Sequence, residues 1–212
     1  MADETAFRNL IVETGRRLWL RGYVASNDGN ISVRLDDGSI LVTPTGVSKG
    51  FLRSEDLVVV SRSGERIRGP RVPTSELGVH LAAYAASPRI MAVVHAHPPA
   101  ATAFAAAGVE LDHDILPEVV VTLGRVPTAP YGTPSTSELE AAVAPFLAEH
   151  AAVLLENHGA LTVGPDLETA YFRMETVEHA ADVAIRARTL GGPRRLPGAA
   201  VEKLSELRSE GD

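Results

Sequence analysis

Residues 90–109 read IMAVVHAHPPAATAFAAAGV and place two histidines where an apolar segment gives way to a turn. The apolar start predicts a buried strand over residues 90–95, and His97-Pro98-Pro99 predicts a turn after it. The alanine-rich residues 100–107 predict a helix. Because side chains two positions apart on a strand lie on the same face, His95 and His97 can share one metal ion. The alternative is a pair of polar residues that merely closes the strand.

A third histidine lies in a short turn between two apolar segments. Asn157-His158-Gly159 separates residues 152–155 from residues 161–163, and both segments are expected to be strands. Three neutral imidazoles with an open fourth position are typical of a catalytic zinc site, whereas four protein ligands are typical of a structural one. The chain contains no cysteine, so imidazole and carboxylate are the expected ligands of a zinc-like divalent ion.

Glu76 is the candidate carboxylate, in the segment Pro73-Thr74-Ser75-Glu76-Leu77. Thr74 or Ser75 is expected to cap a helix that runs to about Ala86, which places Glu76 in the first turn. Acidic residues are common at helix starts because the helix dipole favours them there, and this is the structural alternative. His80 lies one turn later and is expected to be a packed residue rather than a ligand.

Three short segments are suited to binding an oxyanion such as phosphate: Gly29-Asn30, Thr45-Gly46 and Thr74-Ser75. Each combines small or hydroxyl side chains with backbone N–H groups at a turn or a helix start, which can hold phosphate without a basic cluster. Each segment is also typical of an ordinary turn or cap. Lys49 and Arg71 are expected on the solvated surface.

The rest of the chain alternates between helical and strand patterns. The predicted helices cover residues 4–21, 136–149, 166–190 and 199–208, and the further predicted strands cover residues 31–35, 40–43, 57–61 and 119–122. Neither a regular βαβ rhythm nor a GxGxxG or phosphate-binding P-loop motif is present. We therefore expect an α/β fold: a three-layer α/β/α sandwich around a mixed, largely antiparallel sheet, with residues 1–212 as a single domain.

Charge and composition exclude several classes of partner. The chain has 20 Lys+Arg against 27 Asp+Glu, a net charge of −7, so no overall field attracts nucleic acid or anionic lipid. No apolar run approaches the ~20 residues that span a bilayer. The first residues, MADETAFRNL, lack the basic and apolar regions of a secretory signal. We expect a cytoplasmic protein with neither a nucleic-acid nor a membrane partner.

Six segments occur in a characteristic order: SNDGNISVR, LVTPTGVSKG, PTSELGVHLAAYAASP, AVVHAHP, VPTAPYGTP and LLENHGALTVG. Together they resemble the class II aldolase/adducin-head family, and most closely its L-fuculose-phosphate aldolase branch. The resemblance covers nearly the whole chain. It is highly specific for the family and much less specific for one reaction within it.

The resemblance implies a metal-dependent aldolase that reversibly cleaves a ketose 1-phosphate of the fuculose, ribulose or deoxypentulose type. The products would be dihydroxyacetone phosphate and an aldehyde, formed through an enediolate. The implied metal is one Zn²⁺ per subunit, with Mn²⁺ and Co²⁺ as alternatives. The implied ligands are Glu76, His95, His97 and His158, and Glu76 would also be the catalytic base. The implied phosphate-binding residues are Gly29, Asn30, Thr45, Gly46, Thr74 and Ser75. Family members are commonly homotetramers with sites at subunit interfaces.

Two other functions remain alternatives. One is a sibling enzyme on the same metal site, namely a sugar-phosphate epimerase, a decarboxylase or a methylthioribulose-phosphate dehydratase. The other is a non-catalytic, adducin-like binding module. Glu at position 76 fits the aldolase branch, because the epimerase branch usually carries Asp there.

The chain departs from the fuculose-phosphate aldolase pattern at its proton donor. The aldolases use a tyrosine in the segment that here reads LDHDILPEVV, and residues 109–125 contain no tyrosine. No tyrosine follows Tyr171 either. His113, Asp114 and Glu118 are candidate substitutes, and the departure predicts an aldehyde other than L-lactaldehyde.

Overall fold

The computed structural model describes residues 4–211, and eight strands within them form one sheet. The strand order is β4-β3-β2-β1-β5-β8-β7-β6. The bounds are β1 Asn30–Arg34, β2 Ile40–Val42, β3 Val58–Val60, β4 Arg66–Arg68, β5 Ala92–Ala96, β6 Thr128–Ala129, β7 Ala152–Leu155 and β8 Gly159–Gly164. Neighbouring strands are antiparallel except β6 and β7, so the sheet is mixed and largely antiparallel, as predicted.

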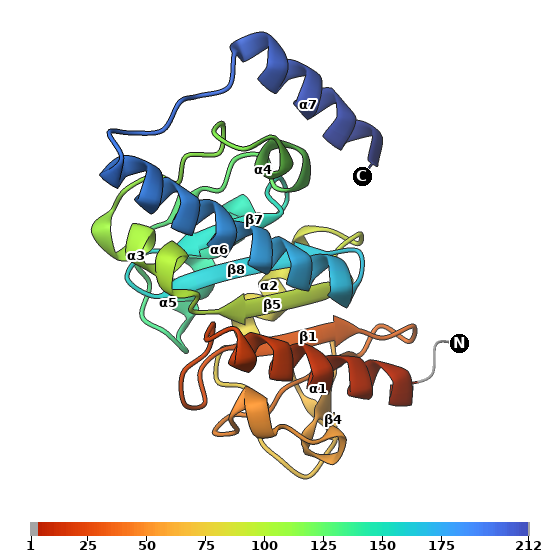
Figure 1. Ribbon diagram of the computed structural model, residues 1–212. Helices are drawn as coiled ribbons and strands as arrows, with labels where there is room; N and C mark the ends of the chain where they lie inside the picture. The colour runs from red at the N-terminus through yellow and green to blue at the C-terminus, as the bar shows by residue number, and fades with distance from the viewer. Residues whose placement is uncertain (1–3, 212) are drawn as a thin grey trace.

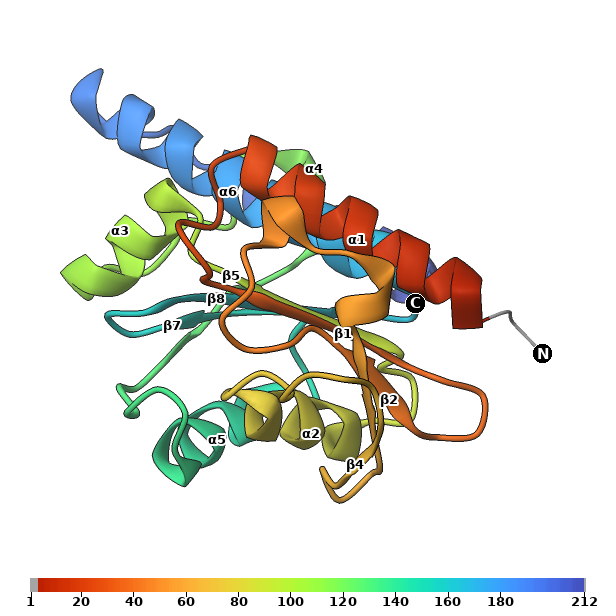
Figure 2. The ribbon, with the colours of Figure 1, turned by 90° about the horizontal axis from the view of Figure 1, so that it is seen from below.

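Helices cover both faces of this sheet (Figure 1 and Figure 2). One face carries α1 (Glu4–Leu20), α3 (Pro99–Ala107), α4 (Pro117–Thr122) and α6 (Leu167–Thr189). The opposite face carries α2 (Leu77–Ala86) and α5 (Ser137–Val143), and α7 (Gly198–Gly211) packs against α4. Short 3₁₀ turns are η1 (Lys49–Phe51), η2 (Ser54–Asp56) and η3 (Ala144–Phe146).

The two cores follow the alternation of side chains along the strands. On β5, Ala92, Val94 and Ala96 pack into the core beneath α1, α3 and α6. Val93 packs into the core shared with α2 and α5. The expected three-layer sandwich is confirmed, and the alternation places His95 on the α2 side of the sheet.

Residues 119–122 were expected to be a strand, and this is wrong, because they belong to α4. Pro117 lies at the start of this helix, where a proline is well tolerated because its missing N–H has no partner there in any case. Val119 and Val120 are the buried residues of α4. Tertiary packing of these β-branched side chains therefore outweighs their strand preference.

Two helix boundaries also differ from expectation. The helix expected over residues 136–149 ends at Val143 and continues as η3, because Pro145 supplies no N–H for a further α-helical hydrogen bond. Helix α2 begins at Leu77, so Glu76 is its N-cap residue and Thr74 and Ser75 precede it. The short edge strands β4 and β6 were not predicted. Within the described residues, no helix is both long enough and apolar enough to cross a membrane.

Candidate metal centre

Three histidines converge at one end of the inner strands β5, β8 and β7. His95 lies on β5 and His97 follows directly, and their Nε2 atoms are 3.1 Å apart. His158 lies in the turn between β7 and β8, and β8 is the neighbour of β5 in the sheet. The His158 ring centroid is 4.7 Å from that of His95 and 4.9 Å from that of His97. Sheet pairing therefore brings together residues that are far apart in sequence.

The backbone of the β7–β8 turn allows this approach. Asn157 has a φ of 57°, in the left-handed region that asparagine adopts more readily than most residues. A Cβ atom at Gly159 would lie 2.5 Å from the Ala96 carbonyl oxygen and 2.7 Å from the His97 ring. A glycine at this position is thus required for β8 to lie against the end of β5.

The Glu76 side chain turns toward the histidines instead of capping its own helix. Its carboxylate makes no capping hydrogen bond to α2. Oε2 lies 3.4 Å from Nε2 of His95, and Oε1 lies 3.3 Å from Nε2 of His158. This orientation argues against the structural reading of Glu76 as an ordinary acidic residue at a helix start.

The donor atoms suit a divalent metal ion. Nδ1–H of His95 donates to the Ala160 carbonyl at 3.0 Å, so Nε2 of His95 carries a lone pair. A carboxylate oxygen of Asp28 lies 3.5 Å from Nδ1 of His97 and orients that ring in a similar way. Burial lowers the pKa of His95 and of His158, which keeps both rings neutral. Ligands of one tetrahedral zinc ion lie about 3.3 Å apart, close to the separations seen here. Oε1 of Glu76 is buried and accepts no hydrogen bond from the described residues, as expected of a metal ligand.

A buried chain of hydrogen bonds holds Glu76 from behind. The carboxylate can only accept, so the side-chain NH₂ of Asn30 donates to Oε2 at 2.8 Å. The Asn30 oxygen then accepts from Nε2–H of His80 at 2.5 Å. Nδ1 of His80 accepts from the Ser32 hydroxyl at 2.6 Å, and Ser32 accepts from the Tyr84 hydroxyl at 2.7 Å. His80 is packed, as expected, and these hydrogen bonds occupy both of its ring nitrogens.

A polar pocket of about 210 Å³ is lined by three of the four candidate ligands, Glu76, His97 and His158. All the residues predicted to bind phosphate line it: Gly29, Asn30, Thr45, Gly46, Thr74 and Ser75. The side-chain amide of Asn30 is hydrogen-bonded to Glu76 and to His80, so it is not free to bind a ligand in the pocket.

Lys49 also lines this pocket, and its expected place on the solvated surface is wrong, because it is 2% exposed. No local feature of its sequence marks it as buried. Asp28 and Ser135 are further lining residues that the sequence did not single out. Arg71 lies apart in an ion pair with Asp56.

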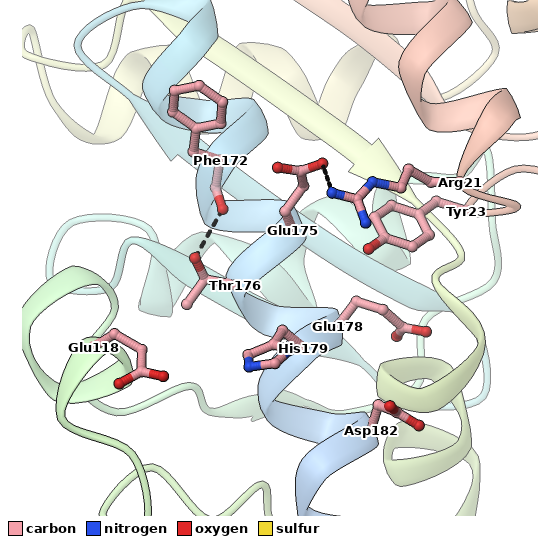
Figure 3. Close-up of a pocket in the computed structure, with 9 residues that line it drawn as sticks. All are labelled: Arg21, Tyr23, Glu118, Phe172, Glu175, Thr176, Glu178, His179 and Asp182. Atoms are coloured by element: carbon pink, nitrogen blue, oxygen red, sulfur yellow. Dashed lines mark hydrogen bonds and ion pairs between the residues drawn. The ribbon is translucent and has the colours of Figure 1, made fainter.

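A larger pocket of about 570 Å³ lies on the α6 face, and Figure 3 shows its lining. It contains the carboxylates of Glu118, Glu175, Glu178 and Asp182 against one guanidinium, that of Arg21. Glu175 is ion-paired with Arg21, and Glu178 accepts backbone N–H groups at the start of α3. This acidic surface disfavours a phosphorylated ligand, so the smaller pocket is the better candidate site.

The candidate substitutes for the missing tyrosine do not gather at the metal centre of the same chain. Glu118 lines the larger pocket, and Asp114 is ion-paired with Arg195. His113 does not line the smaller pocket either.

Complete burial lowers the pKa of His80 to about 4. We therefore expect this ring to stay neutral in the folded protein as the pH falls from 8 to 5, as the Nε2–H tautomer. An unfolded histidine binds a proton near pH 6.5, so stability decreases as the pH falls below that value. Long-range ¹H–¹⁵N NMR of the histidines tests this, and His80→Gln assigns the signal. A His80 signal that titrates above pH 6, or that has the Nδ1–H pattern, would contradict the arrangement.

Comparison with known proteins identifies the family of this chain. The model of the class II aldolase and adducin N-terminal domain family matches residues 9–185. The chain is 34% identical over 211 residues to a 3-oxo-tetronate 4-phosphate decarboxylase of Pectobacterium atrosepticum, covering 98% of this chain and 94% of the relative. It is 36% identical over 168 residues to an L-fuculose phosphate aldolase of Methanococcus maripaludis, covering 79% of this chain and 90% of the relative. Its structure is similar to that of YgbL from Escherichia coli, with a TM-score of 0.89, 32% identity and coverage of 95% and 99% of the two chains. The chain belongs to the class II aldolase and adducin N-terminal domain family.

Proposed function

We propose that this protein is a metal-dependent lyase that cleaves a carbon–carbon bond in a phosphorylated keto sugar and releases dihydroxyacetone phosphate. The observation that carries the proposal is the orphaned Oε1 of Glu76, which lies 3.3 Å from Nε2 of His158, within a cluster of three histidines beside a polar pocket. A scaffold has no need of four convergent ligand groups at the edge of a pocket.

His95, His97, His158 and Glu76 are the proposed holders of the metal. Imidazole with carboxylate suits zinc, and manganese and cobalt accept the same set. When bound, a divalent ion would act as a Lewis acid and stabilise negative charge on the substrate oxygens. The backbone carbonyl of Ala160 and the carboxylate of Asp28 orient the rings of His95 and His97 for this purpose.

Glu76 is the proposed base. Its carboxylate removes a proton from the hydroxymethyl carbon of dihydroxyacetone phosphate, and the electron pair of the C–H bond moves toward the ketone to give the enediolate. In the reverse step the protonated Glu76 returns that proton to the same carbon. The hydrogen bond from Asn30 fixes the carboxylate during both steps and leaves Oε1 free to turn toward the substrate.

The leaving group distinguishes two versions of this reaction. We propose an aldehyde first, which makes the protein an aldolase acting on a ketose 1-phosphate. Thr45-Gly46 and Ser75-Glu76 fit the aldolase pattern, whereas the decarboxylase branch often has Thr-Asn and Lys-Glu at these two places. Carbon dioxide is the second candidate, because the decarboxylase relative matches 98% of the chain. Retro-aldol cleavage of a ketose 1-phosphate and loss of CO₂ from a 3-oxo-tetronate 4-phosphate both leave the enediolate of dihydroxyacetone phosphate, so one metal site and one base serve either substrate.

Loss of a histidine ligand should abolish metal binding. We expect the wild-type protein to carry about one divalent ion per chain and His95→Ala to carry less than a tenth of that. His179→Ala, a change at an exposed histidine on α6, is the matched control and should leave the metal content unchanged. Metal analysis of the purified proteins by mass spectrometry makes the comparison. A wild-type protein without stoichiometric metal would favour the binding-module alternative.

The base can be tested without knowing the leaving group. The metal-loaded protein in D₂O should exchange one hydrogen of dihydroxyacetone phosphate for deuterium, as followed by proton NMR, and a chelator should stop the exchange. Glu76→Gln should retain more metal than activity and slow the exchange by about 10²- to 10⁴-fold. Glu55→Gln, a change at an exposed carboxylate on η2, should exchange at the wild-type rate. No exchange by the metal-loaded wild type would refute the proposed reaction, and parallel losses of metal and exchange would reduce Glu76 to a ligand alone.

We also propose a homotetramer with its sites at subunit interfaces, as the family resemblance implies. An exposed aromatic pair next to the pocket supports it. The rings of Trp19 and Phe51 are 5.7 Å apart and remain 41% and 72% exposed, and Phe51 shares η1 with Lys49. Light scattering should give the mass of four 22.4 kDa chains, and Phe51→Asp should reduce it, whereas Ile67→Asp on β4 should not. A monomeric wild type would contradict the proposal.

A further inference from the structure

Lys49 is enclosed between helix α1 and the substrate pocket. It begins η1 directly after the loop that contains Thr45 and Gly46. A Cβ atom at Gly15 of α1 would lie 3.0 Å from the Lys49 carbonyl oxygen and 3.4 Å from its Cβ, so the helix packs closely on this residue. With 2% exposure, the ammonium group does not extend into bulk water from this position.

The ammonium group connects the two loops that form the pocket. Nζ donates to the Asn27 carbonyl at 2.9 Å and to the Val47 carbonyl at 2.7 Å. Asn27 belongs to the loop that supplies Gly29 and Asn30, and Val47 follows Thr45 and Gly46. These two bonds use two of the three hydrogens of the group and leave one for a ligand.

The charge of Lys49 has no counter-ion in contact. Among the described residues, no carboxylate oxygen lies within 4.0 Å of Nζ, and both hydrogen-bond partners are neutral carbonyls. Asp28 and Glu76 act on it from a greater distance. Burying a cation without a paired anion is costly, and an anionic ligand in the pocket would offset that cost.

The pocket offers an anion little other fixed positive charge. Among the described residues that line the pocket, Lys49 is the only lysine or arginine. Asp28 and Glu76 also line it and are acidic. Hydroxyl and backbone N–H groups of Thr45, Thr74 and Ser75 supply hydrogen bonds but no full charge. A phosphate dianion in this pocket would therefore depend on Lys49 for charge balance by a lysine or arginine side chain.

We propose that Lys49 is the cation that binds the phosphate group of the substrate, through the third hydrogen of its buried ammonium group. The inference rests on the proposed function for the identity of the substrate, but phosphate binding can be measured without any reaction. Lys49 would thus explain how an acidic chain without a basic patch holds a phosphorylated ligand. The same residue keeps the two phosphate-binding loops at a fixed separation before the ligand arrives.

The chain has only two lysines, Lys49 and Lys203, which makes a direct observation simple. Protein labelled with ¹³C at the lysine ε-carbon should give two NMR signals, and Lys203→Met identifies which belongs to Lys49. Burial lowers the pKa of Lys49 to about 8, so its signal should titrate well below that of an exposed lysine. Inorganic phosphate should raise the pKa of Lys49 by about one to three units and leave that of Lys203 unchanged.

Two results of this titration would overturn the proposal. One is phosphate binding, detected by ³¹P NMR, that leaves the Lys49 signal unchanged. The other is the absence of phosphate binding up to tens of millimolar. Because the wild-type protein is observed directly, the result does not depend on whether a Lys49 variant folds. A response of the Lys49 signal in a protein that fails to exchange dihydroxyacetone phosphate would retain this inference and refute the proposed function.

Lys49→Met then separates phosphate binding from a purely structural role. We expect at least a tenfold loss of affinity for inorganic phosphate, and none in Lys203→Met. Deuterium exchange into dihydroxyacetone phosphate should decrease more than exchange into unphosphorylated dihydroxyacetone. If Lys49 only holds the two loops together, the exchange rates of the phosphorylated and the unphosphorylated compound will decrease by the same factor. This result would contradict the proposal.

Discussion

The carboxylate of Glu76 can accept hydrogen bonds but cannot donate them, and this constraint orders the centre of the molecule. It forces the Asn30 amide to present its NH₂ group, which forces His80 to donate from Nε2. Ser32 must then donate to Nδ1 and accept from Tyr84. A neutral His80 is the form that satisfies this chain, and burial between β1 and α2 keeps it neutral. The orientation of the candidate base is therefore set within the core rather than at the surface.

The order of the strands in the sheet brings the remaining site residues together. Antiparallel pairing sets Asn30 of β1 opposite His95 of β5, and β8 pairs on the other side of β5. Three adjacent strands, β1, β5 and β8, therefore bring the site together at one end. Asn30, which holds Glu76, lies there beside His95 and His97 and beside the turn that carries His158. Shifting β5 by one residue relative to these neighbours would turn its histidines toward the α1 and α6 core, so the apolar alternation that fixes the sheet also fixes the site.

The sequence predicted the parts of the site that depend on local periodicity. The spacing of His95 and His97 placed both rings on one face, and the turn around Asn157 placed His158 at a sheet end. Lys49 was missed because its burial depends on the close approach of α1 at Gly15, which is remote in sequence. Residues 119–122 were assigned to a strand because three consecutive valines carry that preference. In the structure they form a helix, because Pro117 favours a helix start and the helix buries Val119 and Val120.

The proposed site suits both reactions that are named among the relatives of this chain. A phosphate, a ketone and one reacting carbon are common to an aldolase and to the decarboxylase of a 3-oxo acid phosphate. In the proposed reaction, the histidines, Glu76 and Lys49 act on these shared groups. The carbon that accepts the returned proton is the same in either case, and so is the negative charge that develops beside the ketone. Selection between an aldehyde and carbon dioxide must then act through residues around the leaving group, and there this chain lacks the tyrosines that the fuculose-phosphate aldolases use.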